Sequence, residues 1–361
     1  MAPVILQTAA LKPGMVTADD VWGTGQLILP KDTTLTHHII RRLPAWGITA
    51  VGVKKAGPEN AQIEAVSGFP IAEVAEDDPI FYEQYRRATL AAGKIFSHMR
   101  EREGLPYSEL KQLAAVHIFD LLYTKNILNL LYKLQSSVDY TFVHAVDVGI
   151  LAGVIGIWSG YGLKEVQMLS LCGLMHDIGK SQIPLSILNK PGQLTAEERQ
   201  TMNLHPDYGY YLTQSTPGIP IEVQLAVRQH HERENGDGYP HGLKGDKIHP
   251  YAKIVAIADT YDALTTNKVY KRSVPPFMAL EILTEQMWMS LDRQVCLTFI
   301  RHVFNDLIGA TVLLSDGSQA QVMHLGQFLS CRPVVTTTAG KVIDLQLTPD
   351  LTIVEVLKFR T

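Results

Sequence analysis

The chain has 361 residues, 46% hydrophobic and 19% charged, which is long enough for two or three folded domains and excludes extensive disorder. A formal net charge of -4 excludes the broad basic surface that attracts nucleic-acid polymers or anionic membranes. The three cysteines form no CxxC pair, which excludes a disulfide framework and a zinc–thiolate site and indicates a reducing, cytoplasmic compartment.

The N-terminal residues 1–60 are predicted to form a small β-rich unit. Turn motifs occur at Pro13-Gly14 and at 23–25, and strand-like segments follow at 26–29 and 48–53. Its role has two interpretations. It is either a docking or dimerisation module, which implies a homodimer, or a sensory and regulatory input.

The rest of the sequence falls into three segments that differ in their pattern of apolar residues. Residues 61–135 are predicted to form a helical connector, because apolar side chains recur at spacings of three to five. Residues 136–303 are predicted to be helical throughout, and the apolar stretch 148–158 is too short to cross a bilayer, which indicates a core helix. Residues 304–361 are predicted to form a β-rich appendage, with strands at 312–314, 334–338 and 353–357. The predicted fold class is therefore mainly α, a helical bundle with small β-containing terminal segments.

The helical middle contains histidines and aspartates at nearly regular separations. They are His144, His176, Asp177, His205, His230, His231 and Asp259. The gap is 32 positions from 144 to 176 and 25 from 205 to 230, which suits one helix and one connection. A bundle with this spacing can bring one ligand per helix to a single point in its core.

These residue types predict a metal centre. Imidazole and carboxylate donors together suit iron, manganese, zinc or nickel rather than magnesium alone. Seven donors are too many for one ion, and a carboxylate such as Asp177 can bridge two, so a dinuclear centre is predicted. A single histidine such as His144 or His205 is more often a hydrogen-bonded core residue. The pair His176-Asp177 carries most weight, because its apolar neighbours would bury a charge that needs a partner or a metal.

Several motifs in order resemble those of the HD-GYP family, a subgroup of the HD superfamily of metal phosphohydrolases. They are His176-Asp177-Ile178-Gly179-Lys180, His205-Pro206, His230-His231-Glu232-Arg233, Gly236-Asp237-Gly238-Tyr239-Pro240 and Asp259-Thr260-Tyr261-Asp262-Ala263-Leu264. The resemblance covers about residues 136–303. It implies that His144, His176, Asp177 and Asp259 hold one metal, and that His205, His230 and His231 hold a second, with Asp177 bridging. The ions implied are two divalent metals, iron or manganese first, with zinc, nickel or magnesium as alternatives.

The resemblance also implies residues that bind substrate. Lys180 would contact a phosphate oxygen, and Lys268 and Lys271 stand where relatives carry basic residues that grip the substrate phosphates. Lysine there implies looser contact than arginine, which binds phosphate with two parallel hydrogen bonds. The loop Gly238-Tyr239-Pro240 would shape the wall of the site or a surface for other signalling proteins.

One departure from the family concerns a third metal. Relatives with three metals carry Glu four residues before the first histidine, and Tyr140 occupies that position here, so two metals are expected. Asp147 is the only candidate for a substitute third ligand, and its other interpretation is a residue outside the ligand set. Asp262 either orients a ligand histidine or stabilises its helix.

The function implied is a metal-dependent phosphodiesterase that hydrolyses cyclic di-GMP to pGpG, GMP or both, with Asp177 and Lys180 as catalytic residues. Two alternatives stay open. In the first, the protein is a catalytically weak cyclic di-GMP sensor or adaptor. In the second, it is an HD phosphohydrolase that acts on another nucleotide, because fold and metal centre alone do not dictate the substrate. The presence of every expected ligand favours catalysis.

Overall fold

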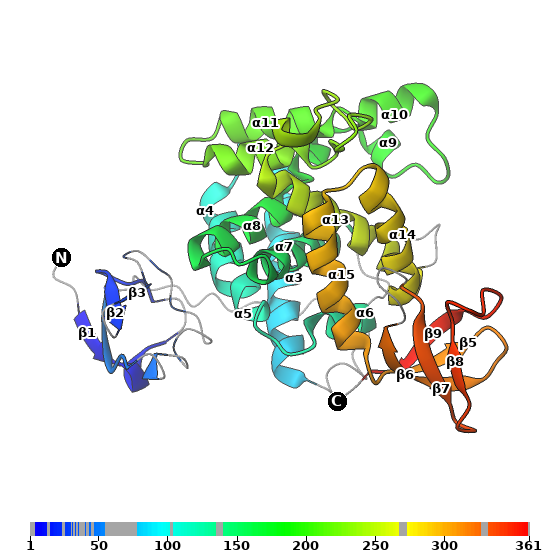
Figure 1. Ribbon diagram of the computed structural model, residues 1–361. Coiled ribbons are helices and arrows are strands. Elements are labelled where there is room, and N and C mark those ends of the chain that lie inside the picture. Colours follow the sequence, from blue (N-terminus) through cyan, green and yellow to red (C-terminus); the bar gives the residue numbers. More distant parts are fainter. Residues whose placement is uncertain are drawn as a thin grey trace.

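The computed structural model describes most of the chain from the first helix onward and parts of the N-terminal segment. The described residues are 4–12, 15–23, 26–29, 31, 33, 35, 40, 43–44, 47–54, 78–101, 104–134, 140–266, 273–325 and 331–359. The N-terminal segment, the helical body and the C-terminal sheet follow one another along the chain (Figure 1). The prediction of a mainly α protein with small terminal β segments is confirmed.

The described part of the N-terminal segment contains two short antiparallel strand pairs. Strand β1 (Val4–Gln7) precedes the single turn η1 (Thr8–Ala10) and pairs with β4 (Ala50–Val53). Strand β2 (Val21–Gly23) pairs with β3 (Gln26–Leu29). The strands predicted at 26–29 and 48–53 therefore correspond to β3 and β4. The turn predicted at Pro13-Gly14 lies outside the described residues.

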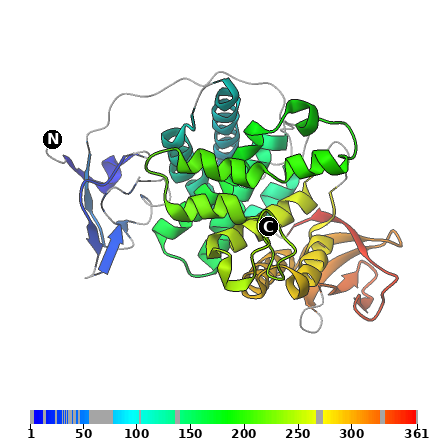
Figure 2. The same cartoon turned by 90° about the horizontal axis from the view of Figure 1, so that it is seen from above.

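The helical body contains every predicted metal ligand. Its elements are α3 (Pro79–Glu101), α4 (Tyr107–Gln112), the π-helical turn η3 (Leu113–Ile118), α5 (Phe119–Leu121), α6 (Ile127–Lys133), α7 (Tyr140–Trp158), α8 (Leu163–Met175), η4 (Ile178–Gln182), α9 (Leu185–Leu188), α10 (Ala196–Met202), α11 (His205–Gln214), α12 (Ile221–Gln229), η5 (Gly245–Lys247), α13 (Pro250–Thr265), α14 (Pro276–Met289) and α15 (Arg293–Leu307). Helices α11 and α12 pack together across one end of the bundle, where α12 also contacts α8 and α13 (Figures 1 and 2).

Local sequence fixes where several of these helices begin. Thr195 and Glu198 form a reciprocal capping box at the start of α10, and the side chain of Asp292 caps α15 by accepting a hydrogen bond from Val295 N. Proline stands in the first turn of α11 and of α13, where its missing N–H costs nothing. Short connections between these fixed ends set the helix order around the site.

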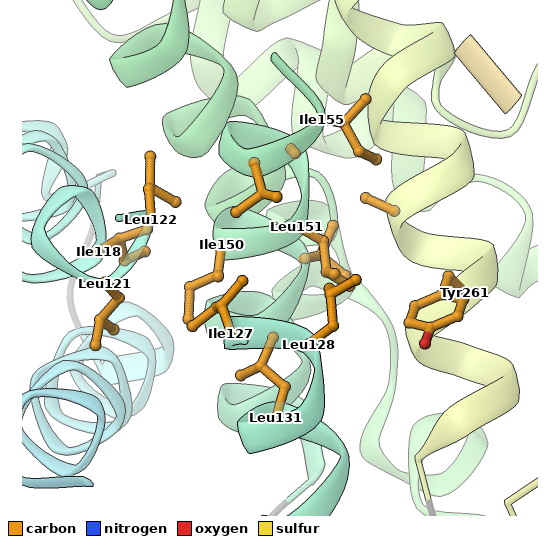
Figure 3. Close-up of a cluster of buried hydrophobic side chains, with 14 of the residues drawn as sticks. Ile118, Leu121, Leu122, Ile127, Leu128, Leu131, Ile150, Leu151, Ile155 and Tyr261 are labelled. Carbon is orange, nitrogen blue, oxygen red and sulfur yellow. The ribbon is translucent and has the colours of Figure 1, made fainter. Parts of the chain in front are cut away.

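The core of the bundle is a continuous layer of aliphatic side chains. Figure 3 shows buried residues of α7, such as Ile150, together with Ile118, Leu121 and Leu128 from elements packed around it. The apolar stretch 148–158 lies within α7, and it is a core helix as predicted. Among the described helices, none combines the length and the apolar character that a membrane span requires.

The C-terminal segment forms one antiparallel sheet. Its strands are β5 (Thr311–Leu314), β6 (Gln319–Leu325), β7 (Pro333–Thr337), β8 (Val342–Asp344) and β9 (Ile353–Lys358), in the order β8-β7-β6-β5-β9. Three of these strands were predicted from apolar runs. Polar residues alternate through β6, and β8 has only three residues, so neither produces such a run. Phe359 packs edge-to-face on Tyr132 and so holds the sheet against the helical body.

Helices α7 and α8 approach so closely that one glycine between them has no room for a side chain. A Cβ atom at Gly173 would lie 2.5 Å from the carbonyl oxygen of Val148, which belongs to the backbone of α7. We expect Gly173→Ala to lower the free energy of unfolding by about 1–3 kcal/mol, measured by urea denaturation in the presence of EDTA.

The matched control is Gly156→Ala. There the new Cβ meets only the flexible end of the Leu169 side chain, at 2.6 Å. Because alanine also gains up to about 1 kcal/mol of helix propensity over glycine, this variant should stay within about 1 kcal/mol of the wild type. Equal losses in the two variants would contradict the proposed backbone contact.

Candidate metal centre

The predicted ligands lie mostly at helix ends on one side of the bundle. His176 directly follows α8 and Asp177 precedes η4, His205 begins α11, and His230 and His231 follow α12. His144 and Asp259 lie within α7 and α13. Helix ends therefore position five of the seven side chains.

The first donor group consists of His144, His176 and Asp259. Their donor atoms all lie within 4.8 Å of one another. Oδ1 of Asp259 is 3.2 Å from Nε2 of His144 and 3.9 Å from Nε2 of His176. All three side chains are largely buried, which makes this a group that could hold one metal ion.

The second donor group consists of Asp177, His205, His230 and His231. Oδ1 of Asp177 is 3.2 Å from Nε2 of His205 and 3.8 Å from Nε2 of His230. Oδ2 of the same carboxylate faces the first group, 3.3 Å from Nε2 of His176 and 3.7 Å from Nε2 of His144. Asp177 thus directs one oxygen toward each group.

Hydrogen bonds to Nδ1 orient four of the histidines. His176, His205 and His230 each place Nδ1 within 2.6–2.8 Å of the carbonyl oxygen three residues earlier. Nδ1 of His144 lies 2.6 Å from Oδ2 of Asp262. A carbonyl oxygen only accepts, so Nδ1 of each of the first three carries the proton, and in neutral imidazoles the lone pair is on Nε2, which faces the centre.

The side chains of the centre differ in the direction in which their surroundings shift the pKa. Burial alone disfavours ionised Asp177, but contacts with His176, Lys180 and His205 outweigh it and hold the pKa of this carboxyl well below its usual range. Burial followed by neighbouring imidazoles lowers the pKa of His230, which is therefore neutral. Burial opposes a charge on His144, yet hydrogen bonds to Asp259 and Asp262 raise its pKa to about 10.

Two observations test whether a metal fits these donors. Nε2 of His176 and Oδ1 of Asp177 are buried and make no hydrogen bond to any residue that the structure describes. Nε2 of His205 and Nε2 of His230 lie 3.3 Å apart, although both rings have their Nδ1 proton directed to a carbonyl. Two facing lone pairs and an orphaned carboxylate oxygen are unfavourable unless a cation lies between them, so the donor set fits divalent metal ions.

Other predicted site residues lie around the donors. Nζ of Lys180 is 2.5 Å from Oδ2 of Asp177, and this contact outweighs burial and raises the pKa of Lys180. The ring of Tyr239 lies 4.6 Å from that of His231 and 6.3 Å from that of His205, so the loop Gly238-Tyr239-Pro240 forms part of the site wall. Lys268 and Lys271 lie outside the described residues, as does the side chain of Tyr140.

The structure adds residues whose sequence signal was weak. Asp262 accepts from Nδ1 of His144, which agrees with the interpretation that it orients this histidine. Glu232 is buried and accepts hydrogen bonds from the backbone N–H groups of His241 and Leu243, which holds the loop beside the site. Asp147 belongs to neither described donor group and is buried against Tyr85. In each case the signal in the sequence was an acidic residue within or close to one of the motifs.

Comparisons with known proteins agree with this geometry. Residues 148–295 match the family model described as "HD domain". The chain is 30% identical over 280 residues to "Cyclic di-GMP phosphodiesterase PA4108" of Pseudomonas aeruginosa, covering 74% of this chain and 67% of the relative. It is 40% identical over 143 residues to "Cyclic di-GMP phosphodiesterase response regulator RpfG" of Xanthomonas campestris pv. campestris, covering 39% and 38%.

Two further similarities extend the comparison. The chain is 34% identical over 165 residues to "3'3'-cGAMP-specific phosphodiesterase 1" of Vibrio cholerae, covering 45% of this chain and 38% of the relative. The solved structure of Bd1817, an HDG"Y"P protein from Bdellovibrio bacteriovorus, shares the fold with a TM-score of 0.50 at 18% identity, covering 83% of this chain and 99% of that one. The chain spans less than half of the Xanthomonas and Vibrio relatives.

A helical body that gathers histidines and aspartates into two adjoining donor groups defines a protein of the HD-domain phosphohydrolase class. Within that class the chain belongs to the HD-GYP family, whose named relatives include cyclic dinucleotide phosphodiesterases. The predicted family is therefore confirmed.

The two donor groups predict the metal content of the protein. We expect wild-type protein loaded with Mn²⁺ to hold two ions per chain, one in each group, by inductively coupled plasma mass spectrometry. His205→Ala should retain about one, because His205 belongs to only one group. The control is His241→Ala, which removes a neighbouring imidazole that contacts Asp207 instead. Loss of metal from the control, or full content in His205→Ala, would contradict the assignment.

Proposed function

We propose that this protein is a cyclic di-GMP phosphodiesterase that uses a dinuclear His/Asp metal centre to open the cyclic dinucleotide to pGpG, GMP or both. The orientation of Asp177 carries the proposal, because one of its oxygens faces each donor group. A carboxylate in that position can hold two cations a few ångströms apart, which is the arrangement that phosphoester hydrolysis uses.

The reaction requires an oxygen nucleophile to approach an anionic phosphorus. Divalent ions in the two groups would supply hydroxide near neutral pH and neutralise the phosphoryl oxygens. Adding water across one P–O bond of the ring gives linear pGpG, and a second hydrolysis gives GMP. Asp177 and Lys180 are the proposed catalytic residues, and His144, His176, His205, His230, His231 and Asp259 are the other proposed ligands.

Lys180 has the position expected of a group that stabilises charge on the reacting phosphate. Its ammonium lies against Asp177 at the edge of the centre, and its side chain is 28% exposed, so Nζ can reach both carboxylate and substrate. A fixed cation at this point would interact most strongly with the non-bridging oxygens as negative charge develops there.

A cavity beside the centre provides room for part of the substrate. Its volume is about 450 Å³, within the range of small-molecule sites, and Asp259 lies in its wall. The other lining residues are Arg233, Asn235, Thr260, Ala263, Leu264, Gln286, Met289 and Ser290. Aliphatic groups there suit the face of a base, and the arginine and glutamine suit its polar edge. We place one nucleoside unit of the cyclic dinucleotide in this cavity. Tyr239, which lies against His231, and Lys268 and Lys271 are proposed contacts for the rest of the substrate.

The alternatives differ in what they require of the site. An adaptor that binds cyclic di-GMP without turnover has no need of a complete donor set, and all seven donors are assembled here. One specific observation favours a different cyclic dinucleotide as the substrate: the Vibrio relative is named as a 3'3'-cGAMP-specific phosphodiesterase. Binding to other signalling proteins through the loop or the N-terminal unit stays a proposal.

Activity should depend on the bridging carboxylate. We expect protein loaded with manganese or iron to release pGpG or GMP from cyclic di-GMP, followed by liquid chromatography, and Asp177→Ala to lower the rate by about 10³-fold or more. Unchanged turnover in this variant would contradict the metal mechanism. Stoichiometric binding without product under several metals would favour the adaptor, and faster hydrolysis of 3'3'-cGAMP would favour the other nucleotide.

The charge of Lys180 should matter for the rate and not for metal binding. We expect Lys180→Gln to lower kcat by about 10²-fold with the metal content unchanged, because the amide retains a hydrogen-bond donor and loses the charge. The matched control is Lys190→Gln. Lys190 has a similarly exposed side chain, 30%, and is ion-paired with Glu198. Equal losses of kcat in both variants would refute the role of Lys180.

A further inference from the structure

A chain of buried hydrogen bonds leads away from the metal centre to helix α3. The hydroxyl of Tyr85 on α3 donates to Oδ1 of Asp147 on α7 over 2.7 Å. The carboxyl group of Asp147 lies beside that of Asp262 on α13, where both line one small hollow, and Asp262 contacts Nδ1 of His144 over 2.6 Å. Tyr85 and Asp147 both precede residue 148, where the match to the HD-domain model begins.

The hydrogen bonds converge on the two neighbouring acids. Asp262 accepts from His144 and also from Oγ1 of Thr266 at 3.1 Å. Asp147 accepts from Tyr85 and lies beside Asp262, where a protonated carboxyl of Asp147 can donate to Asp262. Burial and the adjacent Asp262 raise the pKa of Asp147, which agrees with a protonated carboxyl.

These hydrogen-bonded side chains are largely shielded from bulk water. Tyr85, Asp147 and Asp262 expose only 2%, 6% and 4% of their surface. Leu128 and Leu151, both labelled in Figure 3, line the same small hollow as Asp147 and Asp262. In such an apolar setting a lost partner is not replaced by solvent, and the remaining groups rearrange or stay unsatisfied.

We propose that Tyr85 and Asp147 are positioning residues of the metal centre that act through Asp262 on His144. Tyr85 fixes the carboxyl of Asp147, which fixes the carboxylate of Asp262, which in turn holds the imidazole of His144 with Nε2 directed to the metal. Asp147 is therefore a hydrogen-bonding link and not a third metal ligand. This inference rests on the proposed metal centre.

A consequence is that α3 forms part of the site. Helix α3 packs against α7, where Phe96 and Phe142 lie 6.0 Å apart, and Tyr85 adds a polar link to this apolar contact. A displacement of α3 along α7 would break the bond between Tyr85 and Asp147. Through this link the position of α3 acts on the affinity of the centre for metal.

The test measures Mn²⁺ affinity by competition with a fluorescent chelator and the Mn²⁺ environment by electron paramagnetic resonance, both without nucleotide. We expect Tyr85→Phe to weaken Mn²⁺ binding by about tenfold and to change the spectrum, because outer hydrogen-bond partners typically contribute 10–100-fold to metal affinity. Tyr82→Phe is the matched control. Tyr82 is a buried tyrosine on the same helix, and its hydroxyl has no partner among the described residues.

Two substitutions of Asp147 separate positioning from packing and from direct ligation. In Asp147→Asn the amide oxygen can accept from Tyr85 and the amide N–H can donate to Asp262, so we expect Mn²⁺ affinity within about threefold of the wild type. Asp147→Leu keeps the volume without the hydrogen bonds and should lose about 10–100-fold. Equal loss in the Asn and Leu variants would overturn the link and favour direct ligation by Asp147.

Urea denaturation of each variant in EDTA provides the control for folding. Equal Mn²⁺ affinity in Tyr85→Phe and Tyr82→Phe would overturn the proposal, whatever their stability. Wild-type protein that binds two Mn²⁺ ions and hydrolyses no cyclic dinucleotide would refute the proposed function, while the affinities of these variants would still decide the role of Tyr85.

Discussion

The structure depends on one electrostatic constraint, the burial of the carboxylate of Asp177 between two sets of imidazole nitrogens. Only 9% of its surface is exposed, and its two oxygens face opposite groups. An isolated charge in such a place costs several kcal/mol, so cations must accompany it. Lys180 supplies one positive charge, which balances one of the two acids, Asp177 and Asp259. Metal coordination requires neutral imidazoles, including that of His144. Asp177, Asp259 and Lys180 then carry one net negative charge together, and two divalent ions would convert it to a positive site. Such a local reversal of sign would let a chain with a net charge of -4 bind the dianionic cyclic dinucleotide proposed as its substrate.

This arrangement uses backbone carbonyl groups at helix ends that would otherwise lack a hydrogen-bond partner within the helix. The last carbonyl groups of a helix have no intrahelical partner, and the proposed ligand histidines that follow α8, α10 and α12 use such carbonyls to fix their rings. One set of hydrogen bonds therefore satisfies the helix ends and aims Nε2 inward. His144 lies in the second turn of α7, where the helix's own N–H groups take up the neighbouring carbonyls, and its Nδ1 contacts a side-chain acceptor instead. That difference is why the orientation of His144 depends on Asp262, a residue of another helix.

The sequence predicted the ligand set and the helical fold because both are local in character. Apolar periodicity sets the helices, and motifs such as His176-Asp177 combine a metal-binding pair with flanks that bury it. The hydrogen bond between Tyr85 and Asp147 joins residues 62 positions apart, and no spacing rule encodes it. Asp147 could be recognised near the site, yet its partner required the packing of α3 on α7. Strand β6 was missed for a related reason, since its alternating polar residues gain their place only by pairing with β5 and β7.

The boundary of the catalytic unit is better defined by these interactions than by sequence similarity. The matched HD-domain segment begins at residue 148, and the predicted catalytic domain begins at 136. Either limit separates Asp147 from its donor on α3, because Tyr85 belongs to the predicted connector 61–135. A fragment cut at 136 would keep all seven proposed ligands and lose the group that satisfies Asp147, leaving two adjacent buried acids with one donor fewer. The helical connector is therefore structurally continuous with the metal centre, and the unit that must fold together for the centre to have its native geometry includes α3.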